Sequence, residues 1–250
     1  MPAPITAELI AREPIADGIA QLSFALREPP RLEFKAGQFV SIAVPSSAPP
    51  PSADPDQESL PRRSYSIASQ SDAGELLRFI IRVIPEGKAS EFLMSLPLGA
   101  SVTMTGPHGF FVLDERHPGD VVFGATGTGF AAVMPMLGEL ARRREAGIES
   151  PRSLVLWGAR QESDLFARDE IRALVTRAGA ELRIFLTAPG PQWDGDRGRI
   201  TPAMLDRLPD LTAPTFYLVG NGAMISELKR ELIARGVNRR AQIRTEAFFD

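Results

Sequence analysis

Hydrophobic and polar residues alternate along the first half of the chain, from Ile5 to about Leu113. A period of two is typical of β-strands that bury one face. Glycine and proline separate the runs, so we expect turns between the strands. Short strands with turns and little helix predict an antiparallel barrel or sandwich. The clearest runs are Leu22, Phe24 and Leu26; Val40, Ile42 and Val44; and Leu77, Phe79, Ile81 and Val83.

One stretch of this half breaks the alternation. Residues 45–61 are rich in proline and serine and offer little apolar surface to bury. Strand-like alternation returns after them. We therefore interpret this stretch as a mobile surface loop inside the first domain and not as a boundary between domains.

After Gly119 the pattern changes to short apolar strands that alternate with helices. Strand-like runs cover residues 121–123, 154–157, 182–186 and 216–219, and helical spacing follows within residues 130–140, 171–178 and 225–233. This alternation predicts a doubly wound parallel sheet. Thr201 and Pro202 suit the N-cap and first residue of a further helix. We expect two domains, a β-barrel over residues 1–115 and an α/β domain over residues 116–250.

Composition narrows the chemistry. The 250 residues include no cysteine, which excludes disulfides, thiolate metal sites and protein-held iron–sulfur clusters. Redox chemistry would therefore come from an organic cofactor. We expect no metal site. A net charge of −3 gives no general attraction for nucleic acid or an anionic membrane. The N-terminus lacks the apolar core of a signal peptide, and no run approaches the roughly 20 apolar residues of a membrane span. We expect a cytoplasmic protein.

The strands of the second half run into small or polar residues. In open α/β sheets, ligands bind beyond the carboxyl ends of the strands. Residues 124–129, Gly-Ala-Thr-Gly-Thr-Gly, are the best nucleotide signal, because glycines let backbone N–H groups approach a pyrophosphate where a helix begins. A glycine-rich turn that only allows tight strand–helix packing is the alternative. The other loops at this edge are residues 158–160, 187–190 and 220–222.

In the first half, residues 62–69 combine two arginines, a tyrosine and three serines. An arginine, an aromatic ring and hydroxyl groups close together could bind a phosphate and support a planar ring. An ordinary strand with exposed arginines would have the same composition. The residues alone leave both readings open.

The order of the motifs resembles the ferredoxin–NADP reductase family. Residues 63–66, Arg-Ser-Tyr-Ser, are similar to the flavin motif of that family, and residues 125–129 are similar to its nicotinamide-dinucleotide loop. Between them lie segments that resemble the pyrophosphate segment and the turn that closes the barrel. Further matches follow in the family's order over nearly the whole chain: residues 85–90, 106–111, 158–160, 198–200, 220–224 and 246–248.

The resemblance implies a flavin site in an antiparallel barrel. Arg63 would neutralise a flavin phosphate, Tyr65 would pack on the ring, and Ser66 would hydrogen-bond near its reactive nitrogen, with Glu246 close to the ring. Ser66 and Glu246 are the expected catalytic residues. The expected cofactor-binding residues are Arg63, Ser64, Tyr65 and Ser66; Ile81, Arg82 and Val83; and Gly87, Lys88, Ala89 and Ser90.

The resemblance also implies a dinucleotide site in the second domain. Thr126, Gly127, Thr128 and Gly129 would hold the dinucleotide, and Arg160 and Arg199 would face its adenosine end. Asn221 and Met224 would flank the nicotinamide, and Phe248 would lie near the flavin ring. Thr187 and Ala188 lack the arginine that phosphate-selective relatives often carry after that strand, so we favour NADH slightly over NADPH.

The implied activity is hydride transfer from NAD(P)H to a bound flavin, FAD rather than FMN, with positioning supplied by the protein. Electrons would pass to a separate acceptor, either a ferredoxin, an oxygenase component or a small oxidant. One alternative is an NAD(P)H:flavin reductase that uses flavin as a dissociable substrate. Another is a non-catalytic flavin-binding subunit that transfers electrons or regulates a partner enzyme.

Overall fold

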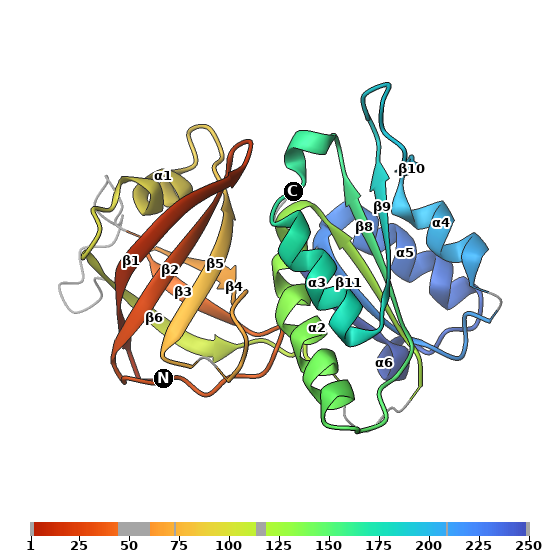
Figure 1. Cartoon of the computed structure of the whole chain (residues 1–250), viewed down its shortest axis with the longest axis horizontal. Helices are drawn as coiled ribbons and strands as arrows, with labels where there is room; N and C mark the ends of the chain where they lie inside the picture. The colour runs from red at the N-terminus through yellow and green to blue at the C-terminus, as the bar shows by residue number, and fades with distance from the viewer. Residues whose placement is uncertain (1–2, 45–60, 73, 114–118, 209, 249–250) are drawn as a thin grey trace, which may run out of the picture.

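The computed structural model describes residues 3–44, 61–72, 74–113, 119–208 and 210–248. These residues form two six-stranded sheets that lie side by side, the first drawn in red to yellow and the second in green to blue (Figure 1). The loop expected over residues 45–61 falls almost entirely outside the described residues. The strands on either side of it pair with each other.

The first sheet is antiparallel, with its strands in the order β4-β3-β6-β1-β2-β5. Along β2 and β5 buried residues alternate with more exposed ones, and Phe24 and Phe79 meet edge to face in the core, with ring centroids 5.8 Å apart. The predicted antiparallel barrel is confirmed. Its elements are β1 (Ile5–Ala16), β2 (Ile19–Glu28), β3 (Phe39–Ala43), β4 (Arg62–Ser66), β5 (Leu76–Arg82), α1 (Lys88–Ser95) and β6 (Ser101–His108).

The second sheet is parallel, with its strands in the order β10-β9-β8-β7-β11-β12. Two helices cover the face toward the barrel and two cover the far face (Figure 1), which confirms the doubly wound prediction. The strands are β7 (Val121–Thr126), β8 (Ser153–Ala159), β9 (Glu181–Leu186), β10 (Asp196–Arg197), β11 (Thr215–Asn221) and β12 (Ile243–Phe248). The helices are α2 (Phe130–Glu145) and α3 (Arg168–Ala178) toward the barrel, α4 (Ile200–Arg207) and α5 (Gly222–Ala234) on the far face, and the short α6 (Arg239–Gln242).

The start of α4 differs from the sequence prediction. The helix begins at Ile200 with Arg199 as its N-cap, so Thr201 is not the cap. Ile200 is buried in the cluster under the far face of the sheet, which draws the helix start forward by two residues. The Thr201 hydroxyl donates to Glu227 Oε2 over 3.4 Å instead of capping the helix.

An apolar cluster continues from the second domain into the barrel. Barrel residues join the side chains of α2, α3 and β7 in this cluster, and Phe111 meets Tyr217 edge to face with ring centroids 5.8 Å apart. The two sheets therefore share a core. The barrel contributes Ile19, Ala36, Ala68, Ile80 and Phe111. The boundary expected at residues 115 and 116 falls outside the described residues and stays a prediction.

Polar contacts also cross between the two sheets. Arg78 Nη2 lies 2.5 Å from Glu170 Oε1, and Arg142 Nη1 lies 2.7 Å from Asp72 Oδ2. Both pairs are partly exposed, so each adds little stability by itself. Together the two ion pairs orient the barrel against α2 and α3.

Candidate functional site

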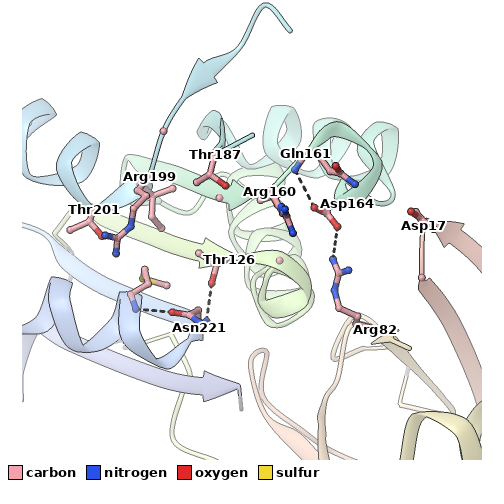
Figure 2. A pocket seen from close by; sticks show the side chains of 17 residues that line it. Asp17, Arg82, Thr126, Arg160, Gln161, Asp164, Thr187, Arg199, Thr201 and Asn221 are labelled. Carbon is pink, nitrogen blue, oxygen red and sulfur yellow. Dashed lines mark hydrogen bonds and ion pairs between the residues drawn. The ribbon is translucent and has the colours of Figure 1, made fainter. Parts of the chain in front are cut away.

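A cavity of about 670 Å³ opens at the carboxyl ends of the parallel strands (Figure 2). Its walls come from the loops after β7, β8 and β9, from the segment between β10 and α4, from the start of α5, and from the turn between β1 and β2. This is where an open α/β sheet binds its ligand. The lining residues are Asp17, Gly18, Arg82, Thr126, Gly127, Gly158, Ala159, Arg160, Gln161, Asp164, Thr187, Gly198, Arg199, Ile200, Thr201, Asn221 and Met224.

The glycine loop after β7 forms the floor of the cavity. Gly127 has a φ of +52°, and a Cβ built on it would meet nothing within 4 Å, so its outer side is open to a ligand. A Cβ on Gly129 would lie 2.8 Å from Gly220 Cα, because the loop after β7 approaches the backbone at the end of the neighbouring strand β11 closely. Glycine suits that close approach, and the helix that starts at this point offers its N–H groups to an anion.

Asn221 organises the end of β11 beside this loop. Its backbone N–H donates to Thr126 Oγ1 over 2.8 Å, and its side-chain oxygen accepts from the Met224 N–H over 2.9 Å as the N-cap of α5. The first bond joins the end of β11 to the end of β7, and the second joins it to the start of α5 (Figure 2). Both Asn221 and Met224 face the cavity, as the sequence predicts for a dinucleotide site.

The side of the cavity away from the barrel carries a charged cluster. Arg199 forms an ion pair with Glu227, and Glu227 also accepts the hydroxyl of Thr201. Arg160 lines the cavity too, and no ion pair of its side chain is found among the described residues. The arginines expected near a nucleotide are thus brought into one cavity, although only one of them is paired with a carboxylate.

The side toward the barrel carries Arg82. Its guanidinium binds Asp164 over 3.0 Å, across the boundary between the two sheets (Figure 2). Asp164 Oδ2 also accepts from the backbone N–H of Gln161, and the Asp17 N–H donates to the Ser163 carbonyl over 3.2 Å. Arg82 was expected at the flavin, but here it lines the cavity together with the dinucleotide residues.

A second contact between the sheets joins the two expected catalytic residues. Ser66, at the end of β4, donates to Glu246 Oε1 on β12 over 2.7 Å. Ser66 is buried, and burial raises the pKa of the Glu246 carboxyl above its ordinary value, an effect that the Ser66 hydrogen bond partly offsets. The fold therefore brings a hydroxyl and a carboxyl together from residues 180 positions apart in the chain.

Tyr65 lies beside this pair on β4. Its ring packs near Phe79, with centroids 6.4 Å apart, and burial raises the pKa of its hydroxyl to about 12 against a lowering effect of Arg63. Arg63 is exposed, and its side chain donates to the carbonyl of Arg62. An exposed guanidinium, a flat ring and a buried residue with a hydroxyl thus follow one another along β4 at Arg63, Tyr65 and Ser66, with the exposed Ser64 after Arg63.

The start of α1 is a second place where an anion fits. The N-cap Gly87 makes no side-chain cap bond, and a Cβ there would lie 2.8 Å from the Ile84 carbonyl. The Ser90 hydroxyl holds the turn by bonding to the Ile84 and Gly87 backbone. The first N–H groups of the helix, at Lys88 and Ala89, are left to bind a phosphate.

Four expected cofactor-binding residues are not among those that line the cavity. Ile81 is buried in the barrel core, so its side chain faces away from any ligand, whereas Val83 is half-buried just beyond β5. Thr128 is half-buried, and Phe248 packs on the shared apolar cluster at the end of β12. Their binding roles stay predictions.

Sequence reasoning did not single out several polar residues of the site. Asp17, Asp164 and Glu227 belong to none of the motifs recognised in the sequence. Their partners lie far away in the sequence, with 82 positions between Arg82 and Asp164. Among the described residues, no group of acidic or histidine side chains could hold a metal ion, and no helix is long and apolar enough to span a membrane.

Two family models match the chain. The oxidoreductase FAD-binding domain matches residues 6–113, and the oxidoreductase NAD-binding domain matches residues 123–230. Ferredoxin–NADP reductase B of Sorangium cellulosum (strain So ce56) is 34% identical over 241 residues, which are 93% of this chain and 92% of that protein. The chain belongs to the ferredoxin–NADP reductase family.

Other members of this family are longer. The reductase component of the naphthalene 1,2-dioxygenase/salicylate 5-hydroxylase systems of a Ralstonia species is 30% identical over 92% of this chain, which spans 65% of that protein. Methane monooxygenase component C of Methylosinus trichosporium is 34% identical over 67% of this chain and 46% of its own length. Among solved structures, Amycolatopsis cytochrome P450 reductase GcoB matches with a TM-score of 0.83 at 26% identity, covering 98% of this chain and 70% of that one.

Membership of the family makes this ferredoxin–NADP reductase homologue an oxidoreductase that uses FAD and NAD(P)H. The residues of the chain fit both molecules. The open glycine loop and the large cavity suit a dinucleotide, and the uncapped start of α1 suits a pyrophosphate. The half-buried Tyr65 ring on the same barrel suits a flat heterocycle.

Proposed function

We propose that this protein is an NAD(P)H-dependent reductase that holds FAD on the barrel and delivers electrons to a separate acceptor protein, a ferredoxin or an oxygenase component. The observation that carries the proposal is the Ser66–Glu246 hydrogen bond of 2.7 Å. It brings the flavin motif on β4 against the last strand of the nucleotide-binding sheet. In this proposal the flavin site of the barrel and the coenzyme site of the second domain meet at this contact. Hydride transfer requires the nicotinamide and flavin rings to touch, and this arrangement allows it.

In this proposal the barrel residues bind the flavin. Tyr65 supports the ring, and Arg63 and Lys88 neutralise phosphate charge together with the N–H groups at the start of α1. Gly87 allows the backbone to turn tightly enough for that approach. When bound, FAD supplies the redox chemistry, because it accepts a hydride and can release electrons one at a time.

The second domain positions the nicotinamide coenzyme. Gly127 and the start of the following helix receive the pyrophosphate, while Thr126 and Asn221 hold the strand ends in register beneath it. Burial raises the pKa of the Glu246 carboxyl, which favours its protonated form beside the flavin, and Ser66 donates a hydrogen bond to its Oε1. The protein contributes position, charge and one exchangeable proton.

The decisive experiment is anaerobic mixing of the purified protein with NADH or NADPH. We expect a yellow protein with one FAD per chain whose flavin absorbance bleaches on mixing and returns when an acceptor is added. Ferredoxins, oxygenase components and small oxidants would be compared as acceptors. A colourless protein that reduces only added flavin would instead be a flavin reductase with a dissociable substrate. Failure to bleach a bound flavin would indicate a non-catalytic subunit and contradict the proposal.

A cytoplasmic location is part of the same proposal. It agrees with the use of NAD(P)H, which is regenerated inside the cell. Cell fractionation with detection of the native protein tests it, and recovery outside the cytoplasmic fraction would overturn it.

A further inference from the structure

Arg199 and Thr201 lie at the end of the cavity that is farthest from the barrel. Figure 2 shows them on the opposite side from Asp17 and Arg82, which come from barrel strands. A nicotinamide that reaches the flavin must lie toward the barrel. The adenosine half of the dinucleotide therefore lies toward Arg199 and Thr201, on the segment that leads from β10 into α4.

The positive charge at this end is already neutralised. Glu227, on α5, forms the ion pair with Arg199 and accepts the Thr201 hydroxyl, so both polar groups of this wall converge on one carboxylate. The side chain of Glu227 is only 30% exposed, against 57% for Arg199. The carboxylate thus lies under the guanidinium, where water screens it less than at the open surface.

Arg160 does not supply an unpaired positive charge at the Arg199 end of the cavity. It lines the same cavity, and in the view of Figure 2 it lies between Thr187 and Asp164, on the barrel side of Arg199. A cation on that side suits the pyrophosphate, which leaves the ribose with an arginine whose charge is paired.

We propose that Glu227 determines coenzyme choice and that it favours NADH by excluding the 2′-phosphate of NADPH. The proposal rests on the proposed function, since it assigns the adenosine end of the same cavity. A 2′-phosphate bound by Arg199 would lie close to the Glu227 carboxylate, and like charges disfavour that arrangement. A ribose with two hydroxyl groups carries no such charge and is tolerated.

The test is Glu227→Gln in the FAD-loaded protein. The amide keeps the size of the side chain and its hydrogen bonding but removes the negative charge. Calorimetric titration with adenosine 5′-monophosphate and adenosine 2′,5′-bisphosphate isolates the 2′-phosphate without any catalysis. We expect the bisphosphate to bind about tenfold more tightly to E227Q than to the wild type, with the monophosphate within about twofold. The ratio of kcat/KM for NADPH over NADH should rise by about the same factor.

Three further variants serve as controls for this result. Glu231→Gln removes a carboxylate one turn along α5 that binds Arg230 and Arg235 outside the cavity, so neither nucleotide should change its affinity. In the double variant Arg199→Gln, Glu227→Gln the gain for the bisphosphate should disappear, since the freed arginine is gone. Glu227→Ala should act in the same direction as E227Q if the amide perturbs folding.

The outcomes separate this inference from the proposed function. An unchanged preference in E227Q and E227A, together with normal NADH oxidation, would overturn the role of Glu227 and leave the reductase activity standing. A wild-type protein that binds the bisphosphate more tightly than the monophosphate would also overturn it. If neither nucleotide bound and neither coenzyme was oxidised, the cavity would not be a dinucleotide site, and both proposals would fall.

Discussion

The protonation of Glu246 is set by two opposing effects. Burial raises the pKa of its carboxyl, and the hydrogen bond from Ser66 lowers it. In Ser66→Ala only the raising effect remains, so the pKa rises further. If Glu246 supplies its proton during turnover, activity falls as pH rises through this pKa. We expect that falling limb of the kcat–pH profile to move to higher pH in S66A.

Two variants complete this pH experiment. Glu246→Gln removes the ionisable group, so the limb should vanish and kcat should fall about 100-fold, as for the loss of a general acid. Ser95→Ala serves as the matched control, because that hydroxyl is exposed and bonds only the Phe92 carbonyl at the end of α1. A limb that stays in place in S66A would assign it to another group.

Tyr65 contributes its ring rather than its ionisation. Burial raises the pKa of its hydroxyl to about 12, so the phenol is neutral at any pH at which the protein would be assayed. Tyr65→Phe should therefore keep nearly full flavin content, whereas Tyr65→Ala, which removes the ring, should weaken flavin binding by about 1–3 kcal/mol. The absorbance ratio of flavin to protein after gel filtration measures this. Equal flavin loss in both variants would shift the role to the hydroxyl.

At the level of elements, the close approach of the loop after β7 to the end of β11 determines the floor of the cavity. In Gly129→Ala the new Cβ would press on Gly220, 2.8 Å from its Cα, and force the two strand ends apart. We expect a loss of stability of about 1–3 kcal/mol and weaker NAD(P)H binding, measured by denaturant unfolding and coenzyme titration. Gly147→Ala, in open space after α2, should leave coenzyme affinity unchanged. An unaltered affinity in G129A would mean that the strand ends tolerate separation.

The elements themselves follow largely from periodicity. Period-two runs marked the barrel strands, and apolar strands followed by helical spacing marked β7, β8, β9 and β11 with their helices. The first strand-to-helix glycine loop was recognisable because the close approach of Gly129 to the backbone of Gly220 favours glycine there. Helix α1 was not predicted, because its eight residues, Lys88–Ser95, are too short to establish a helical period.

The parts of the site that escaped prediction are contacts between distant elements. Ser66 and Glu246 were named separately from family motifs, yet their mutual bond depends on how β12 extends the second sheet. Asp164 and Glu227 are ordinary acidic residues in the sequence, and only the fold places them against arginines of the cavity. The same placement puts Arg82 in the cavity wall, and its expected role at the flavin stays a prediction.

For the molecule as a whole, the shared apolar cluster predicts that the two domains unfold together. Phe111 is 2% exposed and packs on Tyr217 across the boundary. Phe111→Ala should cost about 3–5 kcal/mol. Both tryptophans, Trp157 and Trp193, lie in the second domain, whereas flavin release reports on the barrel. We expect both signals to shift to the same lower temperature, and a shift of the flavin signal alone would show that the domains melt separately.

The shared core also limits how this reductase could be recombined. A chimera that joins this barrel to the nucleotide-binding half of another protein would set Ile19, Ala36, Ala68, Ile80 and Phe111 against α2 and α3 surfaces that did not evolve beside them. Transplanting the second half alone would leave that apolar surface uncovered. A working hybrid would have to carry these five barrel positions across with the helices they touch.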